Sequence, residues 1–128
     1  GALAWGRANR CEPLTVTVLD AGGHLVAFKR EDESGILRPE IAAGKAYGAL
    51  GFGLSSRAIA EKNPEFLAAV SAASQGRMVP VPGGVLVRDR ETDDILGAVG
   101  ISGDTSSNDE AAAVAGIDAA DLHADTGG

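Results

Sequence analysis

The chain has 128 residues, of which 45% are hydrophobic, and a net charge of −7 at pH 7. This length suits one domain with its own core, so we expect a single domain over residues 1–128. The negative charge and an aromatic content of only 4% argue against nucleic acid as a partner, because phosphates attract clustered Lys and Arg and bases stack on aromatic rings. No apolar run approaches the roughly 20 residues that span a bilayer, and no secretion signal is evident, so we expect no membrane contact and a cytoplasmic location. The single Cys11 excludes an internal disulfide.

The first third of the chain predicts a β-hairpin. Residues 1–12 are short and mixed and indicate a partial N-terminal helix. The stretch LTVTVLD (14–20) alternates and is rich in β-branched residues, which is typical of a strand. DAGG (20–23) supplies a turn and HLVAFKR (24–30) the returning strand. The polar residues 31–35 then form a loop.

The middle of the chain predicts helices. Over residues 36–51, apolar and small side chains recur at helical spacing. Gly44 and Gly48 interrupt this run four residues apart, which indicates close approach by another backbone. A short helix is expected over 54–63, and a further helix begins with Asn63 as its N-cap, followed by proline.

The last third predicts a second pair of strands. Residues 75–84 form a proline-containing loop with room for a short edge strand. VLVRD (85–89) is a strand, RETDD (90–94) a turn, and ILGAVGIS (95–102) the partner strand.

One more helix is expected after these strands. Residues 107–122 are alanine-rich, and Ser107 as N-cap with Glu110 three residues later fits a capping box. The tail, residues 123–128, is predicted to be disordered. Hairpin pairs give an antiparallel sheet, so this order of elements predicts an α+β fold with helices packed on the sheet.

Four segments together resemble a known family. They are VTVLDAGGHLVAFKRED, IAAGKAYGALGF, VPVPGGVLVRD and ILGAVGISGDTSSNDEAAAVAGI. Their order and spacing, over roughly residues 14–117, are similar to those of the GlcG/HbpS-like family, which includes the C-terminal domain of PduO-type proteins. The resemblance implies a profilin-like fold with a central antiparallel sheet flanked by helices. It also implies a homo-oligomer, often an octamer, and heme binding. The chain departs from the family in lacking most of a long N-terminal helix and in having Asp104 where a second glycine is common.

His24 is the first candidate site residue. An imidazole can ligate heme iron and titrates near neutrality, so His24 is predicted to be an axial iron ligand or an acid–base group. The alternative is a histidine at the start of a strand that only bonds a neighbouring carbonyl. Alternation places His24 on one face with Val26, Phe28 and Arg30, as a heme would need for its ring and a propionate. The chain has no CxxCH motif, so any heme is held reversibly. The other histidine, His123, is not expected to be a ligand.

Two glycine-containing loops form the second candidate site. Backbone N–H groups in VPGG (81–84) and in GISGDTSSND (100–109), beside a helix N-terminus, favour an anion such as a heme propionate or a small carboxylate. Lys45 adds a positive charge, as do Arg30 and Arg38. We expect 82–84 and 102–105 to lie side by side and face Lys45 across a small cavity. The alternative is that these glycines serve only turns and close packing. The predicted ligand-binding residues are His24, Arg30, Lys45, Pro82, Gly83, Gly84, Ser102, Gly103 and Asp104.

Three functions remain open at the level of sequence. The first is reversible binding of heme or a related tetrapyrrole. The second is a lyase or isomerase that acts on a small organic acid through Lys45, His24 and Asp104. The third is an oligomeric scaffold with a vestigial pocket, assembled through the small-residue faces of 36–51. No catalytic triad, Walker loop, zinc spacing or dinucleotide fingerprint is present.

Overall fold

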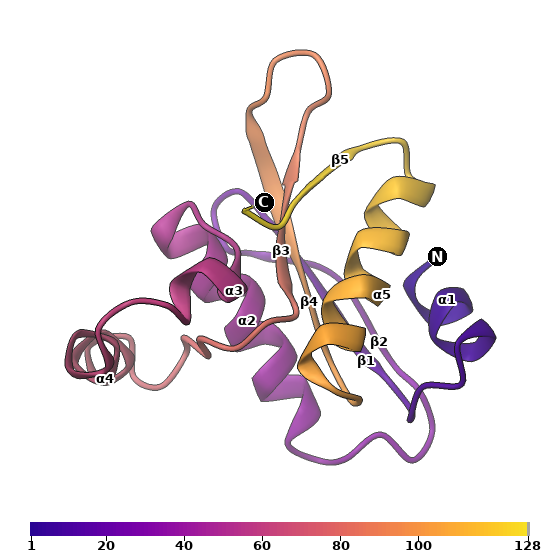
Figure 1. Ribbon diagram of the computed structural model, residues 1–128, viewed down its shortest axis with the longest axis horizontal. Helices are drawn as coiled ribbons and strands as arrows, with labels where there is room; N and C mark the ends of the chain where they lie inside the picture. Colours follow the sequence, from indigo (N-terminus) through magenta and orange to yellow (C-terminus); the bar gives the residue numbers. More distant parts are fainter. Residues whose placement is uncertain (128) are drawn as a thin grey trace.

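The computed structural model describes residues 1–127, which form one antiparallel sheet with helices on both faces (Figure 1). The five strands are in the order β2-β1-β4-β3-β5. The strands are β1 (Thr15–Asp20), β2 (Leu25–Arg30), β3 (Gly84–Arg88), β4 (Ile95–Ser102) and β5 (His123–Asp125). The helices are α1 (Ala2–Ala8), α2 (Arg38–Phe52), α3 (Ser56–Ile59), α4 (Pro64–Ala73) and α5 (Ser106–Ala119). The predicted α+β fold with a central antiparallel sheet is confirmed.

The sheet separates two apolar layers. Helix α2 packs on one face, where Ala46 and Ala49 contact Leu19, Leu86 and Ala98. Helices α1 and α5 cover the other face (Figure 1). The buried residues of that second layer are Ala2, Cys11, Leu14, Val85, Val87, Val99, Ile101, Ala112, Ala113 and Ile117. Alternate residues of β3 and β4 point into opposite layers, as the period of a strand requires.

The glycines of α2 admit another part of the same chain. A Cβ at Gly48 would lie 2.6 Å from Cγ of Met78, and a Cβ at Gly44 would overlap the side chain of Val79. The Val79 N–H also donates to the Gly44 carbonyl, 3.1 Å away. The predicted close approach is therefore confirmed. Since residues 77–79 fill this face, it is not the free surface on which the sequence-based expectation of an oligomer rests.

The C-terminal tail is ordered as far as the structure describes it, so the prediction of disorder over 123–128 is wrong for residues 123–127; residue 128 lies outside the described part. Strand β5 pairs antiparallel with β3, and Arg88 Nε donates to Asp125 Oδ2 over 2.8 Å. The polar sequence HADT has no strand periodicity of its own. The open edge of β3 imposes the extended conformation through backbone hydrogen bonds.

Helix α5 begins earlier than predicted. Its N-cap is Thr105, whose side-chain oxygen accepts a hydrogen bond from the N–H of Asn108, so the capping box on Ser107 is wrong. Thr and Ser are both favourable N-cap residues. Thr105 is the cap because the helix starts soon after the chain leaves β4. The loop 75–84 contains no strand before Gly84.

Helix α4 stands apart from the sheet at the end of a long excursion (Figure 1). Its N-cap is Asn63, as predicted, but none of its residues is buried. None of the helices within residues 1–127 combines the length and apolar character needed to cross a bilayer.

Candidate functional site

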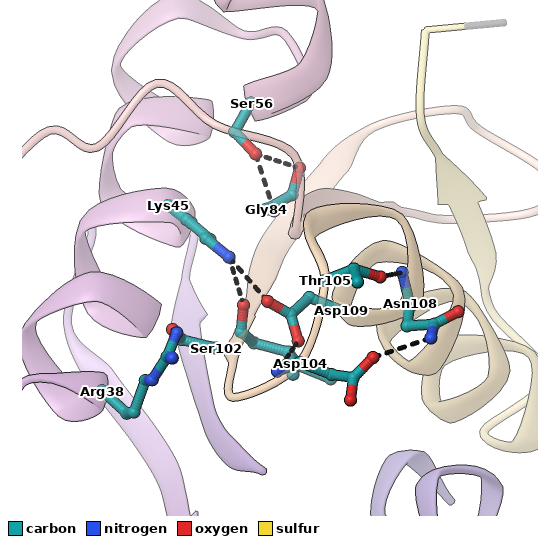
Figure 2. A network of polar contacts seen from close by, with 10 residues as sticks. Arg38, Lys45, Ser56, Gly84, Ser102, Asp104, Thr105, Asn108 and Asp109 are labelled. Atoms are coloured by element: carbon teal, nitrogen blue, oxygen red, sulfur yellow. Dashed lines mark hydrogen bonds and ion pairs between the residues drawn. The ribbon is translucent and has the colours of Figure 1, made fainter. Parts of the chain in front are cut away.

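Lys45 is at the centre of a buried polar network (Figure 2). Its side chain is only 2% exposed, and its Nζ donates to the Ile101 carbonyl at 2.8 Å and to Asp109 Oδ2 at 3.0 Å. Asp109, in the first turn of α5, is 1% exposed and accepts the Asp104 N–H through its other oxygen. Burial raises the pKa of Asp109 and lowers that of Lys45, while each partner's charge opposes the shift in the other.

The groups predicted to bind an anion therefore do converge, but the anion that they bind is a carboxylate of the same chain. A cation, a loop N–H and a helix N-terminus converge, and the carboxylate they hold is that of Asp109. The sequence places Asp109 in the first helical turn without showing that it turns inward. Its partner Lys45 is 64 residues away along the chain, so local spacing gives no sign of the pair.

The two glycine loops lie side by side, as predicted. The Ile101 N–H donates to the Gly83 carbonyl over 3.0 Å, and a Cβ at Gly83 would lie 2.7 Å from Lys45 Nζ. Their N–H groups do not share a cavity, however. The Gly84 N–H donates to Ser56 Oγ at 2.7 Å, in an interaction the sequence did not reveal. These glycines admit the α2 backbone, because a Cβ at Gly84 would overlap the Lys45 carbonyl.

Asp104 and Ser102 connect other segments to this network. Asp104 Oδ1 accepts the Glu12 N–H at 2.8 Å, and Oδ2 accepts from Asn108 Nδ2 at 2.7 Å. These hydrogen bonds lower the pKa of Asp104. Ser102 Oγ accepts from Arg38 at 3.0 Å. The two side chains fasten the N-terminal segment and the start of α2 to the end of β4.

Replacing Asp104 by alanine is expected to lower the free energy of unfolding by about 1 kcal/mol at pH 7, because two donors lose their acceptor. The pKa of Asp104 is lowered in the folded protein, so its contribution is present above its unfolded pKa and is lost as pH falls through the folded value. Urea unfolding at pH 7 and pH 3 measures both effects. Asp32→Ala, at an exposed carboxylate, is the control. A loss of the same size at both pH values would contradict this role.

His24 lies at the turn between β1 and β2 and is held by Asp20. Asp20 Oδ1 accepts the backbone N–H groups of Gly22 and His24, at 2.9 and 3.0 Å, and lies 3.2 Å from His24 Nδ1. The hydrogen bonds from His24 and Gly22 lower the pKa of Asp20. Its ionised carboxylate favours the tautomer with the proton on Nδ1, which leaves Nε2 free. The imidazole is 81% exposed.

A bulge at Val26 changes which side chains share a face with His24. The β1–β2 pairs on its two sides are Val18 with Ala27 and Leu19 with Leu25. The extra residue shifts the alternation by one position. The predicted common face of His24, Phe28 and Arg30 is therefore wrong, and Leu25 takes the place of His24 on that face.

The structure does not bring His24 together with the Lys45 network. Asp20, next to the His24 turn, is at one end of β1, and Thr15 at the other end pairs with Ser102. Five residues of strand separate these ends by roughly 17 Å. Arg30 is also at the far end, where its guanidinium donates to the Ser34 carbonyl at 3.0 Å. His24 thus lies at an exposed turn, whereas Arg30 and the Lys45 network lie at the other end of β1.

The surface around the His24 turn is shallow. Two pockets adjoin the turn against Tyr47, with volumes of about 180 and 230 Å³. Pockets that enclose small molecules typically measure roughly 300–1,000 Å³. Arg77 lies over the Tyr47 ring at 4.4 Å and closes one side. Within residues 1–127 no three His, Cys, Asp or Glu side chains are grouped to hold a metal ion.

Comparison with known protein families shows the family to which the chain belongs. The model of the family described as "Haem degrading protein HbpS-like" matches residues 1–118. The chain belongs to this HbpS-like family. The resemblance seen in the sequence is thereby confirmed.

Solved structures agree with the HbpS-like fold. The crystal structure of a PduOC–heme complex matches with a TM-score of 0.85 and 22% identity, over 95% of this chain and 88% of that one. The ORFY protein of Klebsiella pneumoniae matches with a TM-score of 0.80 and 24% identity, over 91% and 81%. A double mutant of HbpS from Streptomyces reticuli matches with a TM-score of 0.76 and 20% identity, over 92% and 77%. Among curated proteins no match was found.

Proposed function

We propose that this HbpS-like protein binds heme or a related tetrapyrrole reversibly, with His24 as the residue that would hold the iron. Family membership and the fold shared with a PduOC–heme complex support the proposal. The observation that carries it is the pair formed by Asp20 and His24, in which a carboxylate orients an imidazole and leaves its Nε2 exposed. Histidines that ligate metals commonly have such a partner, which fixes the orientation of the ring.

The residues that follow His24 offer exposed apolar surface to a flat ligand. Leu25 and Val26 follow it directly and are 65% and 63% exposed. When bound, the heme supplies an iron that takes an imidazole nitrogen as ligand. The protein's part is to hold Nε2 free and to offer apolar side chains to the ring.

The alternatives have less support. A lyase or isomerase that combines Lys45, His24 and Asp104 would need these groups in one place, and they lie at two ends of the sheet. The scaffold with a vestigial pocket would bind no ligand and is an outcome of the experiment below. Assembly into a homo-oligomer, with an octamer as the implied size, is proposed from the family resemblance, and the cytoplasmic location stays a prediction from the sequence.

His24→Ala is expected to weaken hemin binding at least tenfold, or about 1.4 kcal/mol, and to leave the fold intact. His123→Ala, which removes the other histidine, an exposed one, is the matched control and is expected to bind like the wild type. Hemin titrations followed by Soret absorbance measure the affinities, and circular dichroism checks folding. Equal affinities for wild type and His24→Ala would overturn the role of His24. Absence of any Soret change in the wild type would favour the scaffold.

A further inference from the structure

The C-terminal strap, residues 121–127, covers the outer edge of β3 (Figure 1). Its strand β5 pairs antiparallel with β3, with Asp125 opposite Leu86. The match to the HbpS-like family model ends at residue 118, so the strap lies outside the part of the chain that the model matches. An uncovered strand edge presents unpaired N–H and C=O groups, with which another chain can pair. The strap therefore occupies a place where an extended segment of another protein would also fit.

The strap is held loosely compared with the strand that it covers. None of residues 121–127 is buried, although Leu122 and Ala124 pack against the apolar layer under α1 and α5. The ladder between β5 and β3 spans three residue pairs. In β3, by contrast, Val85 and Leu86 are fully buried. A segment that buries little apolar surface opens at a much lower free-energy cost than the whole domain, so we expect the strap to detach while β3 stays folded.

Arginine side chains on the β3 side hold the strap by its carboxylates. Arg88 Nε donates to Asp125 Oδ2 at 2.8 Å, and Arg90 Nε lies 3.3 Å from Asp121 Oδ1. Arg88 also donates through Nη1 to the Asp93 carbonyl at 2.9 Å, within the β3–β4 hairpin. That second bond involves no strap atom, so the guanidinium stays at the edge when the strap leaves. The edge thus offers a fixed cation to a carboxylate, in a chain whose net charge is −7.

Other contacts hold the strap by its backbone. Ser55 Oγ and Arg57 Nη2 both donate to the Thr126 carbonyl, at 2.7 and 3.1 Å. Any extended segment presents the same carbonyl and N–H groups, so these contacts select for an extended backbone and not for a sequence. Side chains add selectivity through the carboxylate that meets Arg88 and through the small apolar residue just before it, Ala124, which is half-buried.

We infer that the outer edge of β3 is an acceptor site for an extended, acidic segment of another protein, and that the strap occupies this site until such a partner displaces it. The segment that fits has a carboxylate at the position of Asp125 and a small apolar residue just before it. Its backbone completes the ladder with β3, as when a peptide adds a strand to a sheet. The site is on the opposite edge of the sheet from β2, so it does not depend on the proposed function.

Hydrogen exchange in the wild-type protein tests whether the strap opens by itself. The amides of β5 are expected to exchange at least a hundredfold faster than those of the central strand β4, because opening of the strap exposes them while the sheet stays folded. Exchange followed by NMR measures each amide separately. Equal protection of β5 and β4 would show that the strap leaves only when the whole domain unfolds, and the inference would then be wrong.

A charge reversal in the full-length chain tests whether the edge accepts a separate segment. Asp125→Arg places a second cation against Arg88 and releases the strap. The probe is the fluorescein-labelled peptide ADLHADTG, which has the sequence of residues 120–127. Fluorescence anisotropy is expected to show at least tenfold tighter binding to Asp125→Arg than to wild type, because the tethered strap of the wild type competes at a high effective concentration. Asp118→Arg, the same change at an exposed position of α5, is the control and is expected to bind like wild type.

A second peptide tests whether the edge selects for the carboxylate. ADLHARTG, with arginine in place of the aspartate, is expected to bind Asp125→Arg at least tenfold more weakly than ADLHADTG. In Arg88→Asp this preference is expected to reverse, because the edge then carries the opposite charge. The double variant Arg88→Asp/Asp125→Arg restores the pair with its charges exchanged. Its strap is expected to close again and to reduce the binding of both peptides to the wild-type level.

Circular dichroism and thermal unfolding check that each variant is folded. If Asp125→Arg is not, Asp125→Asn, which removes the charge alone, replaces it with an expected gain in affinity of at least threefold. Folded variants that bind ADLHADTG no better than wild type overturn the inference, and so does equal binding of the two peptides. Hemin affinity is expected to be the same in Asp125→Arg and in wild type, so failure of the peptide test leaves the proposed function standing.

Discussion

Replacing Lys45 by methionine is expected to lower the free energy of unfolding by about 3–5 kcal/mol at pH 7. Methionine retains most of the volume of the lysine stem and removes the charged amino group with its hydrogen bonds. The variant leaves Asp109, 1% exposed, without its cation, and leaves the Ile101 carbonyl without its donor. Urea or thermal unfolding, followed by circular dichroism, measures the loss.

Adding Asp109→Asn to Lys45→Met distinguishes two causes of the lower stability: an Asp109 charge without a partner, and poorer packing around residue 45. In Lys45→Met/Asp109→Asn the buried charge is gone, and the asparagine oxygen still accepts the Asp104 N–H. This double variant is expected to recover most of the lost stability, because an uncompensated buried charge costs more than a missing ion pair. Arg90→Met, which breaks an exposed pair with Asp121, is the control and is expected to cost under about 1 kcal/mol. A double variant no more stable than Lys45→Met would contradict this account.

The single variant is also expected to respond to acid in a defined direction. Burial raises the pKa of Asp109, and the variant removes the lysine charge that opposes this. A raised folded pKa means that the folded state binds the proton more tightly, so the cost of the lone carboxylate is present at neutral pH and falls as pH drops. The stability difference between wild type and Lys45→Met is therefore expected to narrow as pH falls from 7 through the raised folded pKa of Asp109. A difference that does not change with pH would show that the charge of Asp109 is not its source.

Gly100→Ala is expected to destabilise the protein by about 3 kcal/mol. Gly100 lies on β4 directly beneath α2, and a Cβ there would overlap the Ala42 carbonyl and lie 2.9 Å from the Ala46 nitrogen. Both obstacles are backbone atoms of the helix, so the helix itself must move away from the sheet. The same substitution at Gly51, on the open side of α2, meets no atom within 4 Å. Gly51→Ala is expected to stabilise by about 0.5–1 kcal/mol, because alanine is the better helix former.

Chemical denaturation of these two variants and the wild type measures both effects. A loss at Gly100 no larger than 0.5 kcal/mol, roughly the scatter of surface substitutions, would show that α2 does not pack as closely on β4 as the structure indicates.

Local chemistry in the sequence was sufficient for much of the fold. The alternation in 14–20 and 95–102 predicted β1 and β4, and the Asn63 cap predicted where α4 begins, because these signals act between neighbouring residues. The spacing of Gly44 and Gly48 likewise predicted that another segment packs closely on this helix, but it did not predict which segment. The four family segments added the arrangement of sheet and helices, which periodicity alone did not supply.

Tertiary structure decided the rest. Strand β5 forms because β3 has an open edge with which it can pair. The bulge at Val26 changes the face on which His24 lies, and the sequence HLVAFKR contains no signal for this extra residue. The sequence by itself determined that His24 lies at a turn and that Lys45 faces the two glycine loops. Only the folded chain showed that Asp109 occupies the anion site and that His24 lies beyond the opposite end of β1, a strand roughly 17 Å long. The physical reason is that a buried charge needs a partner, and the fold can supply one from a residue far away along the chain. Patterns among neighbouring residues contain no information about such a pair.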